Sequence, residues 1–259
     1  AIEAAIRPNT KVIYFETIAN PSMKVVPVAP VVKIAHDQGI VVVCDNTFAS
    51  PYVMRPLDFG VDIVVESATK FIGGHSDVLG GAICMKSELI PDDFLEQMRW
   101  NNIVKLGATL APFNAWMLGR GIQTLSVRLE RSCCSAATLA AYFENHPSVK
   151  QVWYPGLESH PQHHIAKEQM PRFGGMLTFE VEDGNEALKV LDNLELCCFS
   201  ASLGGVRTTT QIPALMAFLD IPIEQRLEMG IRDGMIRVST GLEDVEDLIA
   251  DFDAALAHL

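Results

Sequence analysis

Residues 40–44 read Ile-Val-Val-Val-Cys, and Asp45 follows them directly. An uninterrupted apolar run of this length predicts a strand with two apolar faces, as a parallel sheet requires. The carboxylate that ends the strand then emerges at the mouth of the sheet, where an ionised group needs a partner. This stretch predicts an α/β domain with a ligand crevice at the end of the strand.

The neighbouring segments continue the α/β pattern. Residues 11–15 form a short β-rich run, and residues 27–39 carry apolar side chains at helical spacing. Residues 62–65 and 80–85 predict two further strands. Strands that alternate with helices indicate a mainly parallel sheet, in which the residues just past the strand ends share one crevice. The segments expected there are residues 16–20, 45–47 and 67–70.

The second half of the chain has a different pattern. Residues 110–142 are mostly helical, and Gly119 and Gly121 mark a weak point where one domain could end. Beyond it, strands are predicted at residues 149–154, 175–181 and 195–200, and helices at residues 185–194 and 242–258. We therefore expect a larger domain in residues 1–120 and a smaller α+β domain in residues 121–259.

The composition excludes several classes of function. The chain has 20 lysine and arginine residues against 32 aspartate and glutamate residues, a net charge of −12, and no basic cluster for nucleic acid. No apolar run approaches the roughly 18 residues of a membrane span, so we expect a cytoplasmic protein without a membrane partner. The six cysteines lack zinc or disulfide-framework spacing, and His160, His163 and His164 lack a matching ligand set, so no metal site is predicted.

Residues 67–70 read Ser-Ala-Thr-Lys and follow a predicted strand. The hydroxyls of Ser67 and Thr69 are suited to a phosphate group, while the amine of Lys70 can reach an aldehyde carbon of the same small molecule. The alternative is a solvated turn. The glycine pair at 73 and 74 favours a binding site, because it lets the backbone pass close to a bound group.

Asp45 allows two interpretations. It is either a helix N-cap or the start of an Asx-turn, which are common roles of aspartate after a strand. Alternatively, its carboxylate pairs with a protonated ring nitrogen and keeps a pyridinium cationic, so that the ring withdraws electrons. Asp45 alone does not decide between them.

Six motifs, taken in order and spacing, closely resemble the Cys/Met-metabolism PLP enzymes, the family of cystathionine γ-lyase, methionine γ-lyase, cystathionine γ-synthase and homoserine sulfhydrylases. They are ETIANP at residues 16–21, DNTFASP at 45–51, SATKFIGGHSD at 67–77, FGGM at 173–176, SLGG at 202–205 and IRVSTGLE at 236–243. The resemblance covers essentially the whole chain. It implies the α/β, aspartate aminotransferase-like fold of PLP-dependent transferases, fold type I, with residues 1–120 as the C-terminal part of the large PLP-binding domain.

The resemblance also implies a role for each matching residue. Lys70 would hold pyridoxal 5′-phosphate (PLP) as a Schiff base and later move a proton. Asp45 would pair with the pyridine nitrogen, and Ser67 and Thr69 would bind the phosphate. Asn20 would lie beside the phenolic oxygen of the ring. Ser202 and Arg237 would hold the α-carboxylate of the substrate. A guanidinium binds a carboxylate in a bidentate manner, although a surface ion pair is the alternative for Arg237.

The sequence departs from the family in three places. Members normally carry a long segment before the position of Ala1, and we expect that it was cleaved or not recorded, the alternative being a truncated product with an open pocket. Ala201 stands where cystathionine-processing members tend to have an acidic residue, which favours a short apolar thioether such as methionine. Arg207 stands where the family usually has a glutamate.

The expected activity is a PLP-dependent γ-elimination from a sulfur amino acid that yields a thiol, a 2-oxo acid and ammonia. The alternative within the family is γ-replacement, as in cystathionine γ-synthase or O-acyl-homoserine sulfhydrylase. An alternative of another class is a catalytically silent fragment that acts as an assembly partner. The resemblance further implies a homo-oligomer, a tetramer of the family type.

Overall fold

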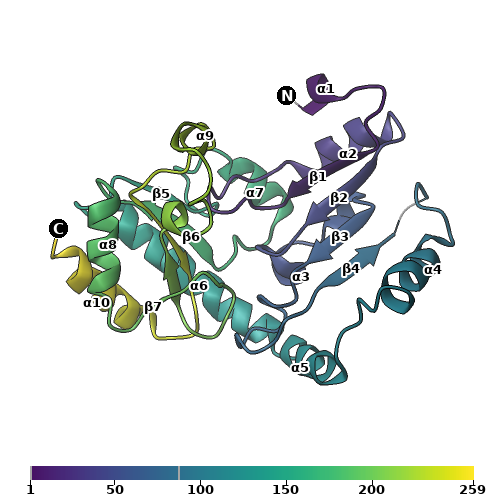
Figure 1. Ribbon diagram of the computed structural model, residues 1–259. Coiled ribbons are helices and arrows are strands. Elements are labelled where there is room, and N and C mark those ends of the chain that lie inside the picture. Colours follow the sequence, from purple (N-terminus) through teal and green to yellow (C-terminus); the bar gives the residue numbers. More distant parts are fainter. Residues whose placement is uncertain (1, 87) are drawn as a thin grey trace.

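A computed structural model describes residues 2–86 and 88–259, and it contains two sheets (Figure 1). The first sheet has the order β1-β2-β3-β4. Its strands are β1 (Val12–Glu16), β2 (Val41–Asp45), β3 (Ile63–Glu66) and β4 (Ala82–Met85). The first three strands run parallel, and β4 pairs antiparallel with β3. The mainly parallel sheet predicted from the sequence is therefore confirmed.

Strand β2 is buried unequally on its two faces. Val42 and Cys44 are fully buried, whereas Val41, Val43 and Asp45 are half-buried. Helix α2 (Val28–His36) packs against β2 and buries an apolar stripe at the spacing of helical turns, formed by Val28, Val31, Val32 and Ala35. The expectation of two buried faces is thus met on one side of β2 only, because α2 covers that side alone.

Among the described residues, five short helices lie before, between or after the strands of the first sheet. These are α1 (Ile2–Ala5), α3 (Ser50–Val53), η1 (Pro56–Phe59), α4 (Phe94–Met98) and the π-helix η2 (Arg99–Val104). Helix α5 (Pro112–Ile122) and the long helix α6 (Leu125–Glu144) follow. The predicted helical region of residues 110–142 is therefore two helices, separated at residues 123 and 124. In the part of the chain that the structure describes, no helix is long and apolar enough to cross a membrane.

The second sheet has the order β5-β6-β9-β8-β7 and is mostly antiparallel. Its strands are β5 (Gln151–Trp153), β6 (Met176–Glu180), β7 (Cys198–Phe199), β8 (Thr209–Gln211) and β9 (Met235–Ser239). The accompanying helices are α7 (His163–Gln169), α8 (Gly184–Asp192), η3 (Pro213–Leu215), α9 (Ile223–Glu228) and α10 (Val245–Leu256). The sequence did not predict β8 or β9, although β9 lies at the centre of the sheet.

Helix α6 contributes side chains to both hydrophobic cores. Leu125, Leu129 and Cys133 on its first half pack into the core of the first sheet. Leu139 and Phe143 on its second half pack into the core of the second sheet. The domain boundary between residues 120 and 121 stays a prediction, and α6 contributes buried side chains to both cores.

Candidate active site

A cavity of about 170 Å³ opens at the carboxyl ends of β1, β2 and β3. It is lined by Glu16, Ile18, Asn20, Asp45, Thr47, Phe48, Ser67, Lys70 and Leu203. Four residues predicted from the sequence, Asn20, Asp45, Ser67 and Lys70, therefore share one cavity. They meet because the ends of parallel strands lie at one edge of the sheet.

The carboxylate of Asp45 is fixed at the end of β2. Its Oδ1 accepts a hydrogen bond of 2.9 Å from the backbone N–H of Thr47, which is the Asx-turn considered as an alternative. Its Oδ2 accepts a hydrogen bond of 3.3 Å from the hydroxyl of Tyr14 on β1. The same carboxylate lines the cavity, so the turn and a binding role are compatible.

The amine of Lys70 lies between the two halves of the chain. Its Nζ donates to Oγ of Ser202 at 3.4 Å. Burial lowers the pKa of Lys70, and the nearby positive charge of Arg237 lowers it further. A lower pKa increases the fraction of neutral amine, which is the form that attacks a carbonyl carbon and accepts a proton.

Arg237 brings a buried positive charge to the same place. It lies on β9 and is only 3% exposed. Its guanidinium donates to Oδ1 of Asn20 at 3.1 Å and to the backbone oxygens of Ala201 at 3.2 Å and Ser202 at 3.1 Å. Its Nε is buried without a hydrogen-bond partner among the described residues. Burial lowers the pKa of Arg237 to about 10.

The surface ion pair considered for Arg237 is wrong. None of the ion pairs formed by the described residues includes this arginine. A buried guanidinium is costly unless it is paired, and here its hydrogen-bond partners are neutral oxygens while Nε has no partner among the described residues. The arrangement is suited to receiving an anion such as a carboxylate.

Two predicted site residues, Thr69 and Ala201, do not line the Lys70 cavity. The hydroxyl of Thr69 donates to the backbone oxygen of Gly80 at 3.2 Å and accepts from its N–H at 3.0 Å. Thr69 lines a neighbouring cavity together with Ser202 instead of the Lys70 cavity. The exposed Ala201 contacts Arg237 through its backbone oxygen. A phosphate-binding role for Thr69 stays a prediction.

Sequence reasoning did not select Glu16, Thr47 or Tyr14. Glu16 accepts a hydrogen bond of 3.0 Å from the backbone N–H of Asn20 and so closes the turn that presents Asn20. Oγ1 of Thr47 accepts from the N–H of Ser67 at 2.8 Å and ties two strand ends together. Glu16 and Thr47 lie inside the recognised motifs, which was the available signal. Tyr14 precedes these motifs, and its position beside Asp45 follows only from the pairing of β1 with β2.

A buried carboxyl group, Glu66, lies directly before Ser67 and is 8% exposed. Its Oε1 accepts from Nδ2 of Asn46 at 2.9 Å, whereas Oδ1 of the same amide is buried without a partner among the described residues. Burial raises the pKa of Glu66 to about 7, against the hydrogen bond from Asn46, and the charge of Asp45 adds to the rise. The folded protein therefore binds a proton here that the unfolded chain releases near pH 4.5.

This proton makes stability depend on pH. Between pH 4.5 and about 7 the folded state holds more protons than the unfolded state, so stability falls as the pH rises through this window. Above it the loss is constant, at about 3 kcal/mol. We expect Glu66→Gln to be more stable than the wild type at pH 8 by an amount that disappears near pH 4. Urea unfolding across this range measures it, with the exposed Glu168→Gln as control. If the free energy of unfolding depended on pH in the same way in Glu66→Gln and the wild type, a raised pKa of the buried Glu66 would be contradicted.

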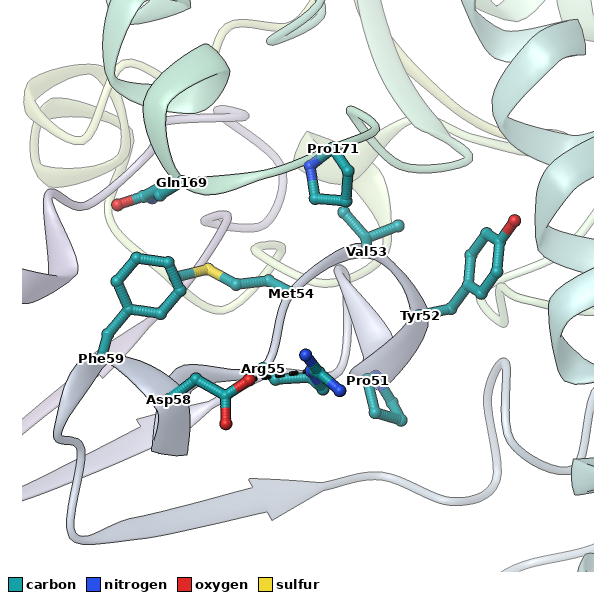
Figure 2. Close-up of a pocket in the computed structure, with 9 residues that line it drawn as sticks. All are labelled: Pro51, Tyr52, Val53, Met54, Arg55, Asp58, Phe59, Gln169 and Pro171. Atoms are coloured by element: carbon teal, nitrogen blue, oxygen red, sulfur yellow. Dashed lines mark ion pairs between the residues drawn. The ribbon is translucent and has the colours of Figure 1, made fainter.

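Figure 2 shows a larger cavity, of about 530 Å³, beside α3 and η1. It is lined by Pro51, Tyr52, Val53, Met54, Arg55, Asp58, Phe59, Gln169 and Pro171. Arg55 and Asp58 form an ion pair of 2.9 Å at its edge. The hydroxyl of Tyr52 donates to Glu130, which also pairs with Arg172. The charged groups here already neutralise each other, and none of the predicted site residues lines this cavity.

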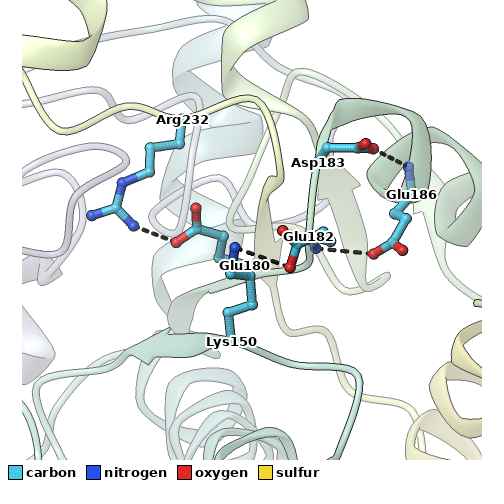
Figure 3. Close-up of polar contacts among 6 residues, drawn as sticks. All are labelled: Lys150, Glu180, Glu182, Asp183, Glu186 and Arg232. Carbon is cyan, nitrogen blue, oxygen red and sulfur yellow. Dashed lines mark hydrogen bonds and ion pairs between the residues drawn. The ribbon is translucent and has the colours of Figure 1, made fainter.

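Figure 3 shows a cluster of charged residues beside the second sheet that make polar contacts with one another. Its members are Lys150, Glu180, Glu182, Asp183, Glu186 and Arg232. Glu180 pairs with Arg232, and Lys150 pairs with Glu182 at 3.1 Å. Asp183 caps α8 by accepting from the N–H of Glu186 at 3.0 Å. These contacts connect β5 and β6 with the start of α8.

Comparison with known proteins agrees with this geometry. The Cys/Met metabolism PLP-dependent enzyme family matches residues 1–257. An L-methionine gamma-lyase of Porphyromonas gingivalis is 44% identical over 261 residues, which cover 100% of this chain and 64% of the relative. A cystathionine beta-lyase of Coxiella burnetii is 44% identical over 98% of this chain and 65% of the relative. A cystathionine gamma-lyase of Bacillus subtilis is 42% identical over 100% of this chain and 67% of the relative.

A solved structure shares the fold. The crystal structure of cystathionine gamma-lyase from Lactobacillus plantarum complexed with L-serine superposes with a TM-score of 0.93 and 40% sequence identity. The match covers 99% of this chain and 66% of that one. The fold class predicted from the motifs is thereby confirmed. The chain spans about two thirds of the length of these relatives.

Proposed function

Because the chain belongs to the Cys/Met metabolism PLP-dependent enzyme family, we propose that it cleaves the carbon–sulfur bond of a sulfur amino acid, with Lys70 holding PLP. The proposed reaction is a γ-elimination that releases a thiol, a 2-oxo acid and ammonia. One observation carries the proposal: the Lys70 cavity combines an amine, a carboxylate and a hydroxyl beside the buried guanidinium of Arg237.

The residues of the cavity fit the chemical groups of PLP. Lys70 would bind the aldehyde carbon, and Asp45 would pair with the ring nitrogen. Ser67, whose hydroxyl makes none of the hydrogen bonds found among the described residues, would hold the phosphate together with Thr69, and Asn20 would lie beside the phenolic oxygen. When bound, PLP supplies an electron-withdrawing ring that stabilises negative charge at Cα of an amino acid.

Side chains of this chain would bind the substrate and accept its proton. Arg237 would anchor the substrate carboxylate, using the Nε donor that has no partner in the described structure. The backbone oxygens of Ala201 and Ser202 hold the guanidinium in place for this task. Nζ of Lys70 would accept the Cα proton, and its lowered pKa favours the neutral amine that this step needs. The hydroxyl of Ser202 would orient that amine.

The products decide between the activities named for the relatives. We expect the purified protein, supplied with PLP, to form 2-oxobutanoate from methionine, cystathionine or homocysteine. Pyruvate from cystathionine would indicate β-elimination, as in the relatives named cystathionine beta-lyase. A product formed only from an activated homoserine ester together with a thiol would overturn the lyase proposal in favour of γ-replacement. A protein that stays colourless with saturating PLP would favour the silent assembly partner.

Ala201 supports a short apolar thioether as substrate, because it places a methyl group beside Ser202 where an acidic side chain would attract a distal amino group. We expect Ala201→Glu to raise the ratio of kcat/KM for cystathionine over methionine by about twofold to fivefold, the size of an exposed charge interaction. Ala201→Gln is the matched control, since it adds the same bulk without the charge. Equal ratios in the two variants would contradict a specificity role for residue 201.

A cytoplasmic location and assembly into a homotetramer complete the proposal. The location is supported by six cysteines that are all free, as expected in a reducing compartment. Assembly is supported by exposed apolar side chains on α5, among them Phe113 and Trp116, whose ring centroids lie 5.9 Å apart. Apolar groups that gather on a surface in this way are typical of contact with other protein segments.

A further inference from the structure

Arg128, on the first half of α6, is a buried arginine without a charged partner among the described residues. It is 7% exposed and takes part in none of the ion pairs of the described chain. Its guanidinium donates instead to neutral oxygens: Phe71 O at 2.8 Å, Ile72 O at 3.4 Å, Gly121 O at 2.8 Å and Thr124 Oγ1 at 3.0 Å. A charge buried in this way persists only where its hydrogen bonds are fully used.

Two of the three carbonyl groups that Arg128 binds belong to Phe71 and Ile72, the residues that follow Lys70. The same segment forms a tight turn, in which Gly73 N–H donates to Ala68 O at 2.8 Å and Gly74 N–H donates to Lys70 O at 2.7 Å. Gly74 has a φ of +73°, and a Cβ at this position would lie 2.0 Å from Nη1 of Arg128. The glycine is therefore required by the arginine as well as by the turn.

The opposite side of this turn is closed as well. A Cβ on Gly204 would lie 2.6 Å from the backbone nitrogen of Phe71, so the loop after Ser202 packs directly on the turn. The backbone of Lys70 is thus enclosed between α6 and the Gly204 loop. Its side chain extends from this enclosed backbone to Ser202.

We propose that Arg128 is a positioning residue that fixes the backbone after Lys70 and thereby sets where Nζ of Lys70 lies. The inference rests on the proposed function only for the role of Lys70, and the clamp itself is a property of the fold. Arg128 acts by geometry rather than by charge, because its planar fork spans several acceptors that an ammonium group cannot reach together.

The test compares two buried arginines. Arg226, on α9, is 5% exposed and donates to Ile231 O at 3.1 Å and to Asp233 at 2.6 Å, far from Lys70 in sequence. In the purified protein without PLP, we expect Arg128→Met to accelerate amide hydrogen exchange at Gly73 and Gly74 by at least tenfold. Arg226→Met should leave these two amides as in the wild type. Arg128→Lys, which keeps the charge, provides a second variant and should also accelerate their exchange.

A second measurement separates positioning from general loss of structure. With PLP present, Arg128→Ala should show reduced visible absorbance of Lys70-bound cofactor, and millimolar guanidinium should restore it by filling the vacated site. The same addition should leave Arg226→Ala unchanged. Wild-type exchange at Gly73 and Gly74 in both Arg128→Met and Arg128→Lys would overturn the inference. A colourless wild type would instead contradict the proposed function, and the exchange result would still stand.

Discussion

Replacement of Lys70 by alanine is expected to abolish both the visible absorbance of bound PLP and the release of 2-oxo acid. Lys70 is the amine that lines the cavity together with Asp45. Its Nζ donates to Ser202, and its neutral form is favoured by burial. The proposed chemistry assigns it two tasks, attachment of the cofactor and acceptance of the Cα proton. Loss of a group that acts as nucleophile and base reduces kcat by at least about a thousandfold.

The measurement is a spectrum and a steady-state assay on the same preparation. Lys33→Ala is the matched control, because the Lys33 side chain on α2 is 76% exposed and pairs with Asp37 at the surface. We expect this control to match the wild type in both readouts. A Lys70→Ala protein that keeps the wild-type spectrum and rate would contradict the assignment of Lys70.

Replacement of Arg237 by methionine is expected to have the second largest effect. Methionine fills much of the same buried space but cannot donate to a carboxylate. The loss of a buried, charge-assisted contact corresponds to a decrease of about a hundredfold to a thousandfold in kcat/KM. Because Arg237 would bind the part of the substrate that does not react, most of the change should appear in KM rather than in kcat.

The control for this prediction is Arg131→Met. Arg131 lies on the surface and pairs with Asp244 at 3.3 Å, so its loss should change KM little. The Arg237→Met protein should still bind PLP, since its spectrum depends on Lys70. An unchanged KM for the amino acid in Arg237→Met would rule out Arg237 as the carboxylate anchor.

The site of the first sheet could be predicted because its signals are local. The apolar run of β2 ends on Asp45, and β3 is followed at once by Ser67 and Lys70. Parallel strands place such residues at one edge regardless of the details of packing. The motifs then supplied the roles that spacing alone left open, as they did for Asn20 and Arg237.

The unpredicted parts depend on contacts between distant residues. Strand β8 has only three residues, of sequence Thr-Thr-Gln, and gives no apolar signal. Strand β9 is buried on both faces although it contains Arg237, whose charge is accommodated by Asn20, 217 positions away in the chain. Arg128 looks like an ordinary helix arginine in the sequence, and only the tertiary structure shows its contact with the turn after Lys70.

In the proposed function, PLP is attached to Lys70 in the cavity at the end of β2. Reduction of the PLP-loaded protein with borohydride, followed by proteolysis and peptide mass spectrometry, identifies the lysine that carries the cofactor. We expect a single phosphopyridoxyl group on the peptide that contains Lys70. A group on another lysine, with the Lys70 peptide unmodified, would contradict it.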